Sequence, residues 1–117
     1  MKMKIIEDLD VYKKSKKFVV KIYMITRSYP ACELYGLTSQ MRRAAVSIIS
    51  NLSEGGSRLS DGELKVFLGY ARGSAAELKA QIIISKEIGL IGDEYDILIS
   101  DITEIHKMIT GLIKSKE

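Results

Sequence analysis

Cysteine, proline, histidine and tryptophan are scarce or missing in this chain of 117 residues, which has one cysteine, one proline, one histidine and no tryptophan. Because Cys32 stands alone, no internal disulfide and no site built on paired cysteines can form, which fits a reducing cytoplasm. The single histidine, His106, excludes a metal site that needs two histidines. With proline only at position 30, long stretches of the chain are free to be helical.

Motifs of common catalytic and nucleotide-binding sites are absent as well. The sequence contains neither G-x-x-x-x-G-K-[ST] nor G-x-G-x-x-G, so it lacks the usual phosphate-binding loops. A Ser-His-Asp triad would depend on His106, whose neighbours Ile102, Ile105 and Ile109 favour a packing role. The Glu-x-x-His pattern of di-iron helical bundles is also missing. We therefore predict a protein that is not an enzyme and that has no cofactor and no metal site.

Long apolar runs are missing too. None reaches the length of a signal peptide or the roughly 20 residues that cross a bilayer. We therefore expect a cytoplasmic protein without a membrane partner. The length is that of one domain, and 46% hydrophobic residues suffice for a core, so we predict a single domain over residues 1–117.

Apolar residues recur at three- and four-residue spacing, which predicts helices. A first helix is expected over about Asp8–Tyr29, because the residue before Pro30 avoids the helical conformation. A second is expected to be capped by Thr38 or Ser39 and stopped by Gly55–Gly56. The apolar stripe of the first comprises Leu9, Tyr12, Val19, Ile22, Tyr23 and Tyr29. That of the second comprises Met41, Ala44, Ala45, Ile48 and Leu52.

Two further helices are predicted in the second half. Ser60 and Glu63 form a capping box for a third helix that stops at Gly89, and Asp93 is expected to cap a fourth. The main stripe of the third comprises Leu64, Phe67, Leu68, Ala71, Ala75, Leu78 and Ile82. That of the fourth comprises Tyr95, Leu98, Ile99, Ile102, Ile105, Ile109, Leu112 and Ile113. Four amphipathic helices with short connections predict an all-α fold, an antiparallel up-down four-helix bundle.

The third predicted helix has a second apolar line, which an isolated bundle would leave exposed. We predict that this line is an oligomer interface, formed by Val66, Tyr70, Gly73 and Ile84. Glu77 and Gln81 also fall on it, and a carboxylate in an apolar seam needs a partner. We predict that Arg43 pairs with Glu77, within a chain or between chains, the alternative being that both face solvent. The predicted structural polar network comprises Arg43, Asn51, Glu77 and Gln81.

The net charge of +3 is unevenly distributed. Residues 1–30 hold eight Lys/Arg and three Asp/Glu, whereas residues 91–117 hold three Lys/Arg and six Asp/Glu. This polarity indicates either attraction between neighbouring helices or subunits, or a basic surface for a polyanion. The candidate phosphate-binding residues are Lys13, Lys14, Lys17, Lys21, Arg42, Arg58 and Arg72.

The stretch YGLTSQMRRAAVSIISNLSEGGSR, from Tyr35 to Arg58, resembles the signature of a bacterial four-helix-bundle family. Members of that family include proteins encoded by intervening sequences in 23S rRNA genes. The resemblance continues through FLGYARGSAAEL (Phe67–Leu78) and covers nearly the whole chain. At greater distance the family is similar to the accessory variability determinant of diversity-generating retroelements, a basic homopentameric barrel that partners a reverse transcriptase and nucleic acid.

The resemblance implies a four-helix bundle, a pentamer with a central channel, and association with nucleic acid. Combined with the residue patterns, it predicts a non-enzymatic, ring-like homo-oligomer that binds RNA or DNA weakly through electrostatic contacts. The alternative is a protein-interaction scaffold without a nucleic-acid role. In either case another protein, such as a nucleic-acid enzyme, is a candidate partner.

Overall fold

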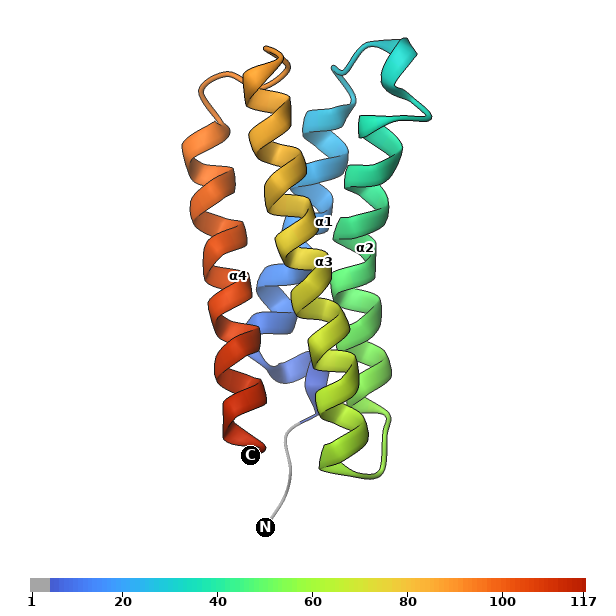
Figure 1. Ribbon diagram of the computed structural model, residues 1–117, viewed down its shortest axis with the longest axis vertical. Helices are drawn as coiled ribbons and strands as arrows, with labels where there is room; N and C mark the ends of the chain where they lie inside the picture. Colours follow the sequence, from blue (N-terminus) through green and yellow to red (C-terminus); the bar gives the residue numbers. More distant parts are fainter. Residues whose placement is uncertain (1–4) are drawn as a thin grey trace.

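The computed structural model describes residues 5–117, and within that range it contains helices and no strand. The all-α prediction is therefore confirmed. The four helices lie side by side along the long axis of a molecule that measures 49 × 25 × 20 Å (Figure 1). The elements are η1 (Ile6–Asp8), α1 (Asp10–Thr26), η2 (Ala31–Glu33), α2 (Leu37–Gly56), α3 (Asp61–Glu87) and α4 (Tyr95–Ser115).

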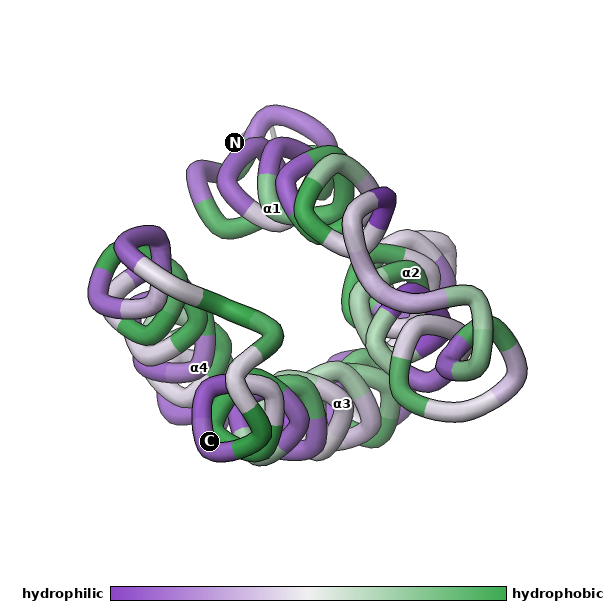
Figure 2. Tube along the Cα trace, turned by 90° about the horizontal axis from the view of Figure 1, so that it is seen from above, coloured by the Kyte–Doolittle hydropathy of each residue, from purple (hydrophilic) through white to green (hydrophobic). Residues whose placement is uncertain are grey.

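The four helices surround one apolar core. A view from above shows hydrophobic positions facing the centre and hydrophilic positions facing outward (Figure 2). Contacts are most extensive between α2 and α3, and they are least extensive between α1 and α4. The connections α1–α2 and α3–α4 lie at one end of the molecule, and the α2–α3 connection lies at the other (Figure 1).

The core-facing stripes of α2, α3 and α4 agree with the predicted ones, whereas that of α1 agrees only in part. Ile22 and Tyr29 are buried as predicted, and Leu9, Tyr12 and Val19 pack against the core. Tyr23 is exposed, and Val11 and Phe18 are buried although the predicted stripe omits them. The buried line of α1 includes Ser15 and Thr26, whose small polar side chains interrupt the apolar periodicity. For this reason the hydrophobic pattern alone omitted part of the buried line of α1 and included the exposed Tyr23.

The start of α2 differs from the prediction, whereas its end at Gly56 agrees with the predicted stop at Gly55–Gly56. The helix already includes Leu37, whose backbone N–H donates to Glu33 Oε1 at 3.1 Å, so neither Thr38 nor Ser39 is the cap. Gly55 and Gly56 are helical and do not adopt the left-handed conformation. Their role is close packing. A Cβ on Gly56 would lie 2.6 Å from Ile6 Cβ, and one on Gly55 would lie 3.0 Å from Leu64 Cδ1.

The predicted ends of α3 are confirmed. Ser60 Oγ accepts the backbone N–H of Glu63 at 3.1 Å, as a capping serine does. After the helix, Gly89 has φ +80°, a conformation that glycine adopts without steric strain. The prediction for α4 is wrong by one residue, because Glu94 rather than Asp93 precedes its first turn.

Candidate functional site

An open hollow between α2 and α3 brings together several of the predicted residues. Its volume is about 490 Å³. Gly69 and Gly73 of α3 leave part of this hollow open, because they have no side chains to fill it. Nothing lies within 4 Å of an ideal Cβ on either glycine. The hollow is lined by Ser47, Asn51, Gly69, Tyr70, Gly73, Ser74 and Glu77.

Hydrogen bonds join the two helices at this hollow. The hydroxyls of Ser47 and Ser74 lie 2.8 Å apart, so one donates to the other across the α2–α3 junction. Asn51 Nδ2 donates to the Ser47 carbonyl at 2.9 Å and to Ser47 Oγ at 3.1 Å. These contacts fix the polar side of the hollow and leave its apolar rim free.

The second apolar line of α3 forms that rim and continues along the helix. Its large side chains are about half exposed: Val66 50%, Tyr70 58%, Ile84 51% and Ile88 55%. The Tyr70 ring is held edge-on against Phe67, with ring centroids 5.7 Å apart. These side chains lie on one flank of α3 and together form its apolar strip, in which Gly73 and the exposed Glu77 separate Tyr70 from Ile84.

The predicted polar network does not form within one chain. In residues 5–117, Arg43 and Glu77 are both exposed and no ion pair joins them. They line different hollows, since Arg43 lies beside Tyr23, Leu34 and Val46 instead. A pair between chains remains a prediction.

Gln81 differs from its predicted position for a geometric reason. It is buried, with Oε1 lacking a hydrogen-bond partner in the described part of the chain. It lies three residues after Leu78 and one before Ile82, which places it on the inner flank of α3 rather than on the exposed line. The network around Asn51 therefore involves Ser47 and Ser74 in place of Gln81.

The lysines of α1 are partly engaged by acidic residues of α4. Lys21 Nζ lies 2.6 Å from Asp101 Oδ2, and Lys14 Nζ lies 3.2 Å from Asp101 Oδ1. Lys14 also approaches Glu104 Oε2 at 3.4 Å. The charge polarity of the sequence thus reflects, at least at these residues, attraction between neighbouring helices.

Burial and pairing act in opposite directions on these groups. Partial burial raises the pKa of Asp101, but the hydrogen bonds and charges of Lys21 and Lys14 outweigh it, and the net pKa lies below the usual value. Burial lowers the pKa of Lys14, while Asp101 and Glu104 raise it by more, so the net pKa is raised. Both shifts favour the charged pair.

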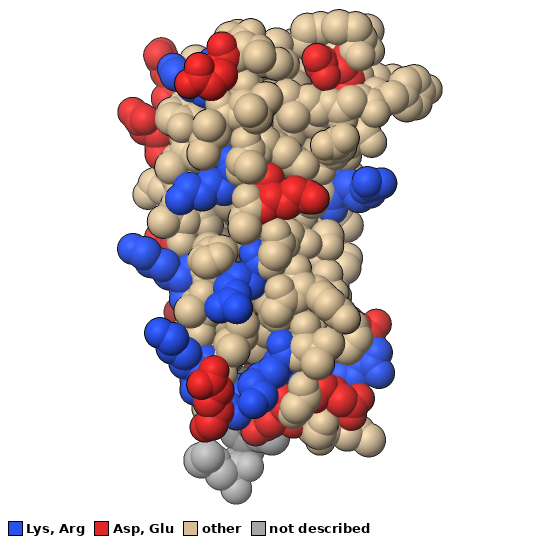
Figure 3. Space-filling view, viewed as in Figure 1, with Lys and Arg blue, Asp and Glu red and all other residues tan. Residues whose placement is uncertain are grey.

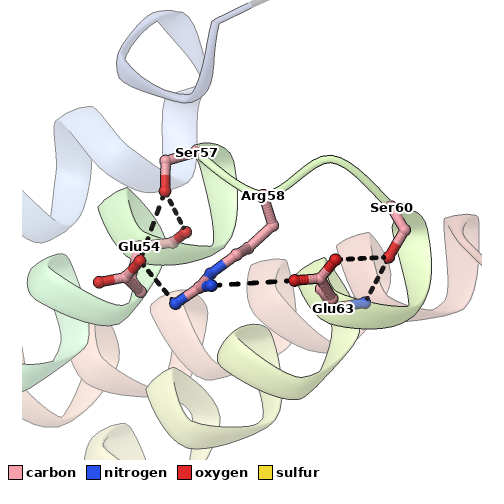
Figure 4. Close-up of polar contacts among 5 residues, drawn as sticks. All are labelled: Glu54, Ser57, Arg58, Ser60 and Glu63. Carbon is pink, nitrogen blue, oxygen red and sulfur yellow. Dashed lines mark hydrogen bonds and ion pairs between the residues drawn. The ribbon is translucent and has the colours of Figure 1, made fainter.

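Arg58 is held by its own neighbours at the α2–α3 connection (Figure 4). Its guanidinium approaches Glu54 Oε2 at 2.9 Å and Glu63 Oε2 at 3.8 Å, and it lies 4.6 Å from the centre of the Phe67 ring. A phosphate at Arg58 would therefore compete with two carboxylates.

Arg42 has a comparable structural role at the other end of α2. Its Nε donates to Thr26 Oγ1 at 2.9 Å, and its guanidinium lies 4.7 Å from the centre of the Tyr23 ring. Of the seven candidate phosphate-binding residues, four take part in no ion pair within the described range: Lys13, Lys17, Arg42 and Arg72. Among these four, Arg42 is engaged by the hydrogen bond and ring contact just described.

Sequence reasoning did not include Gly69 and Ser74 among the site residues, although both line the hollow. It also missed the pairing of Asp101, which the acidic composition of the last segment could have indicated.

Among residues 5–117, no three His, Cys, Asp or Glu side chains lie close enough together to hold a metal ion. Within the same range, no helix is both long and apolar enough to span a bilayer.

Comparison with known proteins identifies the family of this chain. Residues 7–111 match the family described as 23S rRNA-intervening sequence protein. The chain belongs to this family. The match to the 23S rRNA-intervening sequence proteins confirms the resemblance that the Tyr35–Arg58 motif indicated. The more distant resemblance to the accessory variability determinant rests on the sequence motifs alone and remains a prediction.

A solved structure supports the same assignment. The chain is similar to a protein of unknown function from the S23 ribosomal protein family of Bacteroides thetaiotaomicron VPI-5482, with 26% sequence identity. The alignment covers 89% of this chain and 98% of that one, and the TM-score is 0.80. A search of curated proteins gave no match.

Proposed function

We propose that this member of the 23S rRNA-intervening sequence family is a non-enzymatic, self-assembling protein that binds nucleic acid weakly. In this proposal the four helices form an antiparallel up-down bundle, and several copies associate into a ring. The number of copies, five, comes from the distant resemblance to the accessory variability determinant.

The observation that carries the assembly proposal is the exposed apolar strip of α3. Val66, Tyr70 and Ile84 are about half exposed in one chain, and burying each would gain apolar contact area. Gly73 adds no side chain between them, so the backbone of a second helix could approach closely. The polar hollow beside the strip would give the contact a fixed register.

The test is the mass in solution by light scattering, for wild type and for the double substitution Tyr70→Glu with Ile84→Glu. We expect wild type near five times the 13.1 kDa of one chain and the double variant near one chain. The matched control is Val20→Glu with Met24→Glu, because these α1 residues are 57% and 56% exposed and lie off the strip. A single-chain mass for wild type would contradict self-assembly.

The nucleic-acid proposal rests on cations that are not engaged within the chain. Lys13, Lys17 and Arg72 take part in no ion pair in residues 5–117, so they are free to contact phosphates. Lys14, Lys21 and Arg58 would have to give up a carboxylate partner first. Few contacts of this kind give weak binding that depends on salt and tolerates sequence changes.

The alternative function is a protein-interaction scaffold. The ion pairs from Lys14 and Lys21 to Asp101 favour it, because they use part of the basic charge inside the fold. A titration of affinity for a labelled nucleic acid against salt separates the two functions. Binding that weakens steeply between 50 and 200 mM salt supports the nucleic-acid role, and no binding at low salt supports the scaffold.

A further inference from the structure

A row of cations along α3 has no counterpart elsewhere in the molecule's described part. The row consists of Lys65, Arg72, Lys79 and Lys86, each seven residues after the one before. Seven residues turn an α-helix by nearly two full turns, with a drift of about 20°. The four cations therefore occupy one narrow flank along almost the whole of α3.

The row lies on the α4 side of α3, away from the hollow between α2 and α3. Lys86 Nζ lies 5.5 Å from the centre of the Tyr95 ring, and Tyr95 belongs to α4. Lys65, Arg72 and Lys79 are half-buried, so their stems are supported by the protein surface. Basic side chains run down the face over α3 and α4, and acidic ones lie toward its ends and also beside the basic ones in its upper half (Figure 3).

Within residues 5–117 none of the four row cations takes part in an ion pair. This distinguishes them from Lys14 and Lys21, which share Asp101. Among the acidic residues of α3, Asp61 lies on the same flank as the row, four residues or about one turn before Lys65. The α4 helix adds Lys107 and Lys114, again seven residues apart.

We propose that the backbone of a double-helical nucleic acid lies along this row. The inference rests on the proposed nucleic-acid function and assigns its main site to α3 instead of α1. Successive row cations rise by about 10.5 Å along the helix, which exceeds the rise of about 3.4 Å per base pair, so each cation can meet a different phosphate. Lys65 to Lys86 spans about 32 Å, nearly one turn of a duplex.

The side chains around the row favour a duplex over a single strand. Binding of single strands commonly uses aromatic rings on which bases stack. The exposed aromatic residues of the described chain lie elsewhere, since Tyr23 is in α1, Tyr35 precedes α2 and Tyr70 lines the α2–α3 hollow. The row thus offers phosphate contacts without base contacts, which matches a duplex whose bases are paired inside.

The test measures affinity against salt for a labelled 20-base-pair duplex and for one of its strands alone, using the full chain. With four phosphates neutralised, wild-type affinity should fall about 150-fold between 50 and 200 mM salt. Substituting Lys65→Gln with Lys79→Gln should reduce this fall to about 12-fold. The matched control, Lys16→Gln with Arg27→Gln, removes the same charge from exposed positions outside both candidate sites and should behave like wild type. The pair Lys13→Gln with Lys17→Gln tests the α1 site.

Several outcomes would overturn the inference. If the α1 pair flattens the salt dependence and the α3 pair does not, the backbone follows α1, and the proposed function survives without this site. Equal or tighter binding of the single strand would contradict a duplex ligand. If wild type binds neither form at low salt, the nucleic-acid function itself fails. The variant Lys65→Arg with Lys79→Arg should retain the wild-type salt dependence, and circular dichroism would verify that each variant is folded.

Discussion

The α2–α3 and α1–α4 junctions hold neighbouring helices together by different means. At the α2–α3 junction, Gly55 lets α2 approach Leu64 and Phe67, and a hydrogen bond joins Ser47 to Ser74. At the α1–α4 junction, the lysines of α1 reach across to Asp101. Contacts are most extensive at the first junction and least extensive at the second.

The difference indicates what each junction tolerates. The stability of a closely packed junction depends on side-chain volume, because an added group has no space unless the neighbours move. A junction held by long charged side chains responds to charge, pH and salt, because its ion pairs are partly exposed to water. The following predictions test this division, beginning with the largest expected effect.

Gly55→Leu should destabilise the protein by about 1–3 kcal/mol, because overpacking a filled site displaces its neighbours. Even a Cβ at this position would lie 3.0 Å from Leu64 Cδ1 and 3.1 Å from Phe67 Cβ. The free energy of unfolding in urea measures the effect. The control is Gly111→Leu in α4, where nothing lies within 4 Å of the added Cβ. That control should be neutral or stabilising by up to about 1 kcal/mol, and equal stability of both variants would refute the division.

Asp101→Asn should lower the free energy of unfolding by about 1 kcal/mol, since it removes the carboxylate shared by two partly exposed lysines. The Asp101 side chain is only 17% exposed, so we expect its removal to cost more stability than removal of a fully exposed ion pair. Asp96→Asn is the matched control, because Asp96 is an exposed α4 residue outside the ion pairs of the described chain. It should change stability by less than about 0.5 kcal/mol. Equal effects of the two substitutions would show that the ion pairs are not what stabilises this junction.

Acid should remove the same contribution without mutation. The pKa of Asp101 is lower in the folded protein than in the unfolded chain, so the unfolded state takes up the proton first as pH falls. The stabilisation is therefore complete above the unfolded value of about 3.9 and is lost as pH falls through the lower folded pKa. We expect the stability difference between wild type and Asp101→Asn to shrink over that range. A difference that stays constant from pH 7 to pH 2 would contradict this assignment.

Glu77→Gln should have the smallest effect on the single chain, less than about 0.5 kcal/mol, because Glu77 is exposed and outside the ion pairs of residues 5–117. If it pairs with Arg43 of another copy, assembly should weaken about 2–5-fold, and Arg43→Gln should weaken it equally. The double variant should then be no weaker than either single one. Additive losses, measured by light scattering over a dilution series, would rule out the pair.

Local chemistry predicted the boundaries of α3, whereas the caps expected at Thr38 or Ser39 and at Asp93 did not form. Ser60 caps α3 and Gly89 ends it, because a hydroxyl cap and a left-handed glycine act within a few residues of the chain. The error in the α1 stripe arose where Ser15 and Thr26 face the core, since burial of a small polar residue leaves no hydrophobic signal. For the candidate site, the sequence separated the exposed line of α3 from its core-facing stripe at every position except Gln81, which is buried.

The sequence by itself determined the four-helix, all-α fold and the membership of the 23S rRNA-intervening sequence family, because periodicity and ordered motifs are properties of the chain. Only the tertiary structure decided which cations are already paired. Lys14 and Lys17 look alike in the sequence, yet Lys14 meets Asp101 across 87 positions of chain. Similarly, the packing role of Gly56 depends on Ile6 folding back against it. Such pairings depend on distances that arise when the helices pack, which local patterns do not encode.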